Sequence, residues 1–200
     1  VKNPYAKWAF CAGGLGLLIF LFPPLYGEGY DALGPLLNGQ SISYDGDTIL
    51  AFMLHRPWLV PVFFALILIL KVFSMTLTNA GGGVGGTFGP TLFVGAMAGF
   101  LLARVASRLL AGAEFTVPGQ NFVLVGMAGL MAGVMQAPMT AIFLIAEISG
   151  GYELFIPLII TASIAFGTIR IFEKYSIYTK RIAKSGDLLT HDSDQRSEER

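Results

Sequence analysis

The sequence has 200 residues, of which 54% are hydrophobic and only 13% are charged, and its formal net charge is zero. Globular domains carry about 25% charged residues, so this low charge density predicts a body embedded in a membrane. A net charge of zero argues against nucleic-acid binding, and we expect no nucleic-acid partner. The single cysteine, Cys11, excludes an intrachain disulfide and a thiolate metal cluster.

The charges are concentrated near the end of the chain. The last thirty residues carry twelve charged side chains, whereas the long stretch from Pro57 to Ile169 carries very few. We therefore expect a membrane domain over residues 1–184 and a polar cytoplasmic tail or linker over residues 185–200. The chain starts at Val1 without an initiator methionine, so we expect further residues upstream.

Three segments open the chain. Trp8–Phe22 is a glycine-rich apolar run that two prolines end, and Leu25–Gly46 is polar enough for a surface loop with room for a short helix. Trp58–Leu77 is the clearest membrane span, because a bilayer requires about 20 apolar residues. Lys71 interrupts that span, so its long side chain either reaches the membrane interface or faces the protein interior.

The segments that follow are shorter. Pro90–Leu110 has a helical pattern, and Asn121–Met135 and Met139–Ser149 are separated by a predicted break at residues 136–138. At about 1.5 Å per residue, neither short piece spans a membrane core of about 30 Å. Leu154–Ile169 is a further apolar run. Such helices are tolerated where protein or a cavity covers their ends, so we predict an all-α, polytopic membrane protein with short, broken and tilted helices.

Two pairs of glycines have the spacing that permits close contact between helices. These are Gly95 with Gly99 and Gly129 with Gly133, and we interpret both pairs as packing sites. Transporters are often built from two inverted halves, and a chain of this size matches one half of such an inverted repeat.

A run of glycines from Gly81 to Gly86 leads directly into the helical pattern that contains Pro90. Glycine lets backbone N–H groups converge, and a helix that begins there adds the positive end of its dipole. The spacing formally matches a dinucleotide-binding fingerprint, but no strand or ribose-binding acid accompanies it. A flexible loop between helices is one interpretation. An anion site formed by the N–H groups of Thr87, Phe88 and Gly89 is the other.

Three motifs, in order along the chain, resemble the CLC chloride channel and transporter family. The first is Gly86-Thr87-Phe88-Gly89-Pro90, which fits a G-x-F-x-P motif that opens a helix whose amides bind chloride in that family. The second is a pair of apolar segments broken at Ala137-Pro138 and followed by a further apolar helix, as at the family's dimer interface. The third is Tyr178, where the family has a tyrosine whose hydroxyl contacts the central chloride. The resemblance covers residues 70–184, with a looser match from Pro4 to Tyr30.

The resemblance implies transmembrane transport of chloride, by a channel or by an H+/Cl− antiporter. It implies no enzyme activity, no cofactor besides chloride as the transported ligand, and a homodimer formed through the helices of residues 139–172. Two further family motifs, G-S-G-I-P and G-[KR]-E-G-P, do not occur here, so we expect them in a missing N-terminal half of the same protein. The implied anion-binding residues are Gly86, Thr87, Phe88, Gly89 and Tyr178.

A tyrosine suits the proposed role because a neutral O–H donor holds an anion without the full positive charge that would slow its release. Tyr175 is the alternative to Tyr178, and it also fits an interfacial anchor beside basic residues. The basic residues after the last apolar segment predict that the C-terminus is cytoplasmic. They are Lys174, Lys180, Arg181 and Lys184. We expect the protein in the cell membrane.

Two carboxylates need separate consideration. Glu147 lies in an apolar segment, where an acid is a functional candidate, but we favour a carboxylate hydrogen-bonded at a helix end. Glu28, in Gly27-Glu28-Gly29, superficially resembles the family's gating glutamate. It lacks the basic residue before it and the proline after Gly29, so we do not assign it that role.

The remaining function classes have little support. His55 and His191 are far apart in the sequence and have no partner at ligand spacing, so we expect no metal site. No nucleophile, base and acid stand in a catalytic pattern. A secondary transporter of another small or organic anion stays open as an alternative, because it would use the same half-helix chemistry.

Overall fold

The fold is described from a computed structural model, which places residues 4–38, 56, 58–110 and 117–180. Within these residues the regular elements are all helices, so the predicted all-α class is confirmed. Three of the helices, α4, α5 and α8, are long and apolar enough to cross a membrane. The elements are α1 (Pro4–Leu21), the 3-10 helix η1 (Pro23–Leu25), α2 (Tyr30–Leu37), α4 (Val60–Ala80), α5 (Phe88–Leu109), α6 (Gly119–Met135), α7 (Pro138–Ile148) and α8 (Phe155–Phe172).

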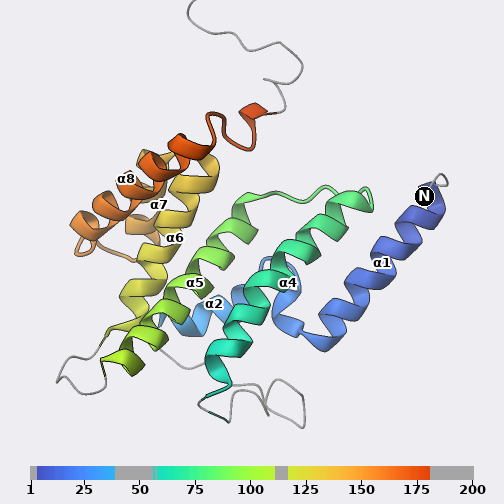
Figure 1. Ribbon diagram of the computed structural model, residues 1–200, viewed down its shortest axis with the longest axis horizontal. Coiled ribbons are helices and arrows are strands. Elements are labelled where there is room, and N and C mark those ends of the chain that lie inside the picture. Colours follow the sequence, from blue (N-terminus) through green and yellow to red (C-terminus); the bar gives the residue numbers. More distant parts are fainter. Residues whose placement is uncertain (1–3, 39–55, 57, 111–116, 181–200) are drawn as a thin grey trace, which may run out of the picture.

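The helices form a layered bundle (Figure 1). α5 packs most closely on α6, and the other side of α6 carries α7 and α8. α4 lies between α5 and α1, while the short α2 contacts both α5 and α6. The glycine run crosses from the end of α4 to the start of α5, so it lies at one end of the bundle.

The predicted helices and the observed ones differ mainly at their ends. The predicted span Trp58–Leu77 corresponds to α4, which continues to Ala80. The predicted helix Pro90–Leu110 corresponds to α5, which already starts at Phe88. The earlier start is physically reasonable, because a proline in the first turn has no N–H that would need a helical partner.

The predicted break after α6 is present. Gln136 ends α6 in the left-handed region with φ 54°, and α7 starts at Pro138, in the position where proline suits a helix best. A side chain at positive φ is unusual outside glycine, and it turns the chain sharply enough to separate two helices.

The first glycine pair forms the closest helix contact of the fold. A Cβ on Gly95 would lie 2.8 Å from the Cα of Met127, and a Cβ on Gly126 would lie 2.9 Å from the Cα of Gly99. Backbone meets backbone here, so larger residues cannot fit. In the second pair, Gly129 meets Thr161 of α8 at 2.9 Å, whereas Gly133 has only an ordinary contact. The packing interpretation is therefore confirmed for three of these four glycines.

Lys71 faces the interior of the protein. Only 2% of its surface is exposed, and its Nζ donates hydrogen bonds to the carbonyl oxygens of Leu25, at 3.3 Å, and Gly27, at 2.8 Å. The Nζ also lies 4.6 Å from the centroid of the Phe93 ring, a distance typical of a cation–π contact. This one side chain therefore ties α4 to η1, to the loop after it and to α5.

Candidate functional site: the amino end of α5

The amino end of α5 presents backbone donors. The first N–H groups of a helix have no partner inside the helix, and Pro90 has no N–H at all. The first helical hydrogen bond of α5 is donated by the amide of Thr91 to the carbonyl of Thr87, at 3.1 Å. The amides of Phe88 and Gly89 come earlier in the helix and therefore have no helical partner. Two adjacent donors at the positive end of a helix dipole are suited to an anion.

A hydroxyl from the other end of the chain meets this helix start. The Oγ1 of Thr87 and the hydroxyl oxygen of Tyr178 are 2.9 Å apart, although the residues are 91 positions apart in the sequence. The same tyrosine hydroxyl lies 4.0 Å from the Sδ of Met135, the last residue of α6. The ends of two helices and the segment after α8 therefore converge at one point.

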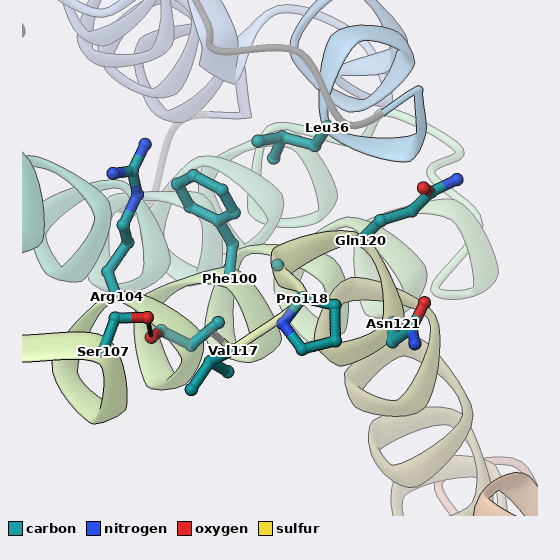
Figure 2. A pocket seen from close by; sticks show the side chains of 10 residues that line it. Leu36, Phe100, Arg104, Ser107, Val117, Pro118, Gln120 and Asn121 are labelled. Carbon is teal, nitrogen blue, oxygen red and sulfur yellow. Dashed lines mark hydrogen bonds between the residues drawn. The ribbon is translucent and has the colours of Figure 1, made fainter. Parts of the chain in front are cut away.

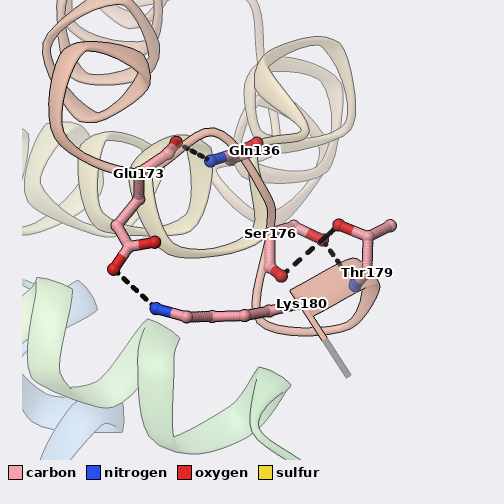
Figure 3. Close-up of polar contacts among 5 residues, drawn as sticks. All are labelled: Gln136, Glu173, Ser176, Thr179 and Lys180. Carbon is pink, nitrogen blue, oxygen red and sulfur yellow. Dashed lines mark hydrogen bonds and ion pairs between the residues drawn. The ribbon is translucent and has the colours of Figure 1, made fainter. Parts of the chain in front are cut away.

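The segment that carries this tyrosine is held by polar contacts (Figure 3). Gln136 donates its side-chain amide to the carbonyl of Glu173 at 2.8 Å, and the Glu173 carboxylate pairs with Lys180 at 2.6 Å. Between them, the hydroxyls of Ser176 and Thr179 are 3.1 Å apart and close a tight turn. The break between α6 and α7 thus positions the tyrosine through Gln136.

The two candidate tyrosines differ in their surroundings. Tyr178 bonds to Thr87, whereas the ring of Tyr175 lies 5.8 Å from the Nζ of Lys174. A tyrosine beside a lysine fits an interfacial anchor, the alternative role of Tyr175. Of the two, Tyr178 is therefore the one whose hydroxyl lies at the start of α5.

The other predicted site residues contribute in different ways. Gly89 is buried in the first turn of α5, and the Phe88 side chain is partly exposed at the helix start. Gly86 is exposed, and a Cβ there would meet nothing within 4 Å. Two other positions in the run favour glycine. Gly82 has φ 91°, a conformation that side chains disfavour. A Cβ on Gly83 would lie 2.9 Å from the Thr78 methyl group, which is too close.

Two charged side chains, Glu28 and Lys71, lie on another side of the start of α5. The carboxyl carbon of Glu28 lies 2.6 Å from the position that a Cβ on Gly89 would take, so the carboxylate rests against the first turn of α5. A cavity of about 400 Å³ lies beside it, between α1, α4 and the glycine run, and Lys71 and Gly86 line its wall. From the sequence, Glu28 is not assigned the gating role because no basic residue precedes it and no proline follows Gly29. The buried Lys71, which needs an opposite charge, was the one available signal for its place beside α5.

A larger cavity lies elsewhere. It has a volume of about 530 Å³ and lies where α5 ends and α6 begins, beside Arg104, Ser107 and Gln120 (Figure 2). The guanidinium of Arg104 stacks over Phe100, with its carbon 5.0 Å from the ring centroid. None of the anion-binding residues predicted from the sequence lines this cavity, so we do not place the site there.

The remaining candidates do not join the site. Glu147 is exposed in the last turn of α7, in agreement with a carboxylate at a helix end. In the part of the chain that the structure places, no three His, Cys, Asp or Glu side chains come together as a metal site. His55 and His191 lie outside the described residues, as do Arg181, Lys184 and the predicted tail.

Comparison with known proteins identifies the family. A family model described as the voltage gated chloride channel matches residues 1–170, and the chain therefore belongs to that family. It is 33% identical over 177 residues to a ClcB-like chloride channel protein of Ralstonia nicotianae, covering 88% of this chain and 37% of that protein. It is 32% identical over 180 residues to the voltage-gated ClC-type chloride channel ClcB of Escherichia coli, covering 88% of this chain and 38% of that protein. The chain thus spans less than two fifths of the length of these relatives.

Proposed function

We propose that this chain provides one half of a transmembrane pathway for chloride, in a channel or in an H+/Cl− antiporter. The observation that carries the proposal is the hydrogen bond between Thr87 and Tyr178 at the start of α5. Family membership and the printed names of the relatives support chloride as the transported anion. The family motifs that are absent from these residues would lie in the other half of the full-length protein, which completes the site.

The chemistry of the site is that of neutral donors. The amides of Phe88 and Gly89 point along the helix axis, and the hydroxyl of Tyr178 adds a donor from outside the helix. In the Thr87–Tyr178 pair either oxygen can be the donor, so Thr87 can donate to the tyrosine oxygen while the tyrosine proton turns toward an anion. Donors without a full charge replace part of the water around chloride and still release it quickly. The proposal includes no cofactor besides chloride as the transported ligand, and no enzymatic step.

The orientation follows from the charges after α8. Arg170 in the last turn, and Lys174 and Lys180 beyond it, place positive charge at this end of the helix. By the positive-inside rule this end faces the cytoplasm, in a protein of the cell membrane.

The outer face of α7 and α8 supports a homodimer through residues 139–172. Apolar side chains are exposed along both helices, and α8 is the least buried of the three membrane-length helices. Such a face requires either lipid or a second copy of the protein. The exposed residues include Met139, Phe143, Ile156, Ile160 and Ile164.

The site is tested by Tyr178→Phe in the full-length protein, with Tyr175→Phe as the matched control. Loss of one hydrogen bond to an anion costs about 1.5 kcal/mol, so we expect roughly tenfold weaker chloride binding for Tyr178→Phe only. Calorimetric titration with chloride measures the affinity, and efflux from liposomes measures transport.

Unaltered binding and flux after Tyr178→Phe combined with Phe88→Ala would contradict the assigned site. If chloride is inert and organic anions compete in the flux assay, the alternative transporter function holds instead.

The dimer is tested by Ile160→Trp on α8, with Leu17→Trp on the exposed face of α1 as the control. A large ring in the proposed interface separates the subunits, whereas the same ring on α1 lies outside that interface. Light scattering of the protein in detergent reports the mass. We expect monomers for Ile160→Trp and dimers for Leu17→Trp, and identical masses for both would argue against this interface.

A further inference from the structure

Glu28 and Gly89 are in contact at the start of α5. The carboxyl carbon of Glu28 is 2.6 Å, and its Oε1 is 2.8 Å, from the position of a Cβ on Gly89. Any side chain on Gly89 would therefore displace the Glu28 carboxylate. Hydrogen is the one substituent that leaves room for it.

The location of this carboxylate is electrostatically favourable. A negative group near the amino end of a helix is stabilised by the helix dipole and by the N–H groups that lack helical partners. The Gly89 amide is one of the donors that we assign to chloride. Glu28 and the transported anion therefore depend on the same positive end of α5.

Lys71 keeps the Glu28 loop in place. Its Nζ bonds to the carbonyl of Gly27, the neighbour of Glu28, at 2.8 Å. The cation and the Glu28 carboxylate attract each other across the cavity that both residues line, and in the described part of the chain they form no direct ion pair. The carboxylate is thus tethered near the helix start without being neutralised by contact.

We propose that Glu28 sets the affinity of the site for its anion, as a tethered carboxylate that shares the amino end of α5 with the transported ion. It opposes anion binding from the side of the charged cavity, while Thr87 and Tyr178 favour binding from the other side. The inference rests on the proposed function, since it concerns the same helix start.

The test is chloride titration of the full-length protein with Glu28→Gln, and Glu153→Gln as the control. Glu153 is an exposed carboxylate in the connection between α7 and α8, away from the helix start. The glutamine keeps the size and the hydrogen-bonding oxygen of Glu28 but removes its charge. Removing a unit charge a few ångströms from an anion site is expected to tighten chloride binding about tenfold. Glu153→Gln should bind like the unchanged protein.

A second variant, Gly89→Ala, tests the contact itself. Its methyl group pushes the flexible Glu28 side chain aside, so it should also tighten binding when Glu28 is present. In the double variant with Glu28→Gln, the methyl group should add nothing, because the charge is already gone.

The outcomes are distinct. Equal affinity of Glu28→Gln and the unchanged protein, or additive effects in the double variant, would overturn the inference alone. Absence of chloride binding in the unchanged protein would overturn the proposed function as well.

Discussion

The helices α5 and α8 are both apolar and long enough to cross a membrane, yet they occupy different environments. In α5, 44% of the membrane-length window is buried inside the protein, whereas in α8 only 11% is buried. Hydropathy does not explain the difference, since α8 is the more apolar of the two. What distinguishes them is the small-residue face of α5, where Gly95 and Gly99 meet the backbone of α6.

This comparison separates two demands on a membrane helix. Apolar side chains suffice to place a helix in lipid, because lipid tails are as apolar as leucine. Glycine at the right spacing is required to bring a helix against a neighbour and to fix where its ends lie. α5 meets both demands, and its amino end is consequently held where Tyr178 reaches it.

The largest expected effect is on the α5–α6 contact. Gly99→Leu places a side chain against the backbone of Phe122 and Val123, where neither helix can yield locally. We expect a loss of about 3 kcal/mol or more, or a failure to assemble. Thermal unfolding of the full-length protein in detergent measures it.

The matched control is Gly167→Leu on α8, where a Cβ would meet nothing within 4 Å in the same subunit. Because Gly167 lies in the segment proposed for the dimer, both glycine variants are compared in the monomeric Ile160→Trp protein. There Gly167→Leu should leave thermal unfolding unchanged. Equal destabilisation by the two substitutions would break the distinction between α5 and α8.

A smaller effect is expected where α6 holds the segment after α8. Gln136→Ala removes the hydrogen bond to the carbonyl of Glu173 and should cost about 1 kcal/mol of stability. Because this bond positions Tyr178, the loss in the free energy of chloride binding should exceed the loss in the free energy of unfolding. Calorimetry and thermal unfolding on the same preparation compare the two. If binding is unchanged while stability falls, Gln136 has only a structural role.

Much of the fold follows from local patterns in the sequence. Apolar runs of sufficient length predict α4 and α5, and Pro138 predicts the break between α6 and α7, because these signals act within a few residues. Helix ends are less predictable, as the earlier start of α5 at Phe88 demonstrates. The low burial of α8 has no local signal, since a side chain that faces lipid and one that faces protein are equally apolar.

Some features of the candidate site could likewise be predicted from the sequence, and others could not. The glycine run predicts a helix start with free amides, and the family resemblance adds Tyr178. The contact between Glu28 and Gly89 could not be predicted, because it joins a loop and a helix that are distant in the chain and share no pattern. The sequence left two places open for Lys71, the membrane interface and the protein interior. The structure places it in the interior, where its partners are two backbone carbonyls, which any residue could supply.

The hydrogen bond between Thr87 and Tyr178 also implies an order in which parts of the protein form during biosynthesis. The amino end of α5 leaves the ribosome long before Tyr178, with α6, α7 and α8 synthesised in between. The glycine contacts of α5 and α6 are available as soon as those two helices are inserted. The proposed anion site, by contrast, is completed only after α8 has been inserted and the chain behind it has folded back. A nascent protein that stops before residue 178 would therefore keep its tightest helix pair and lack its tyrosine donor.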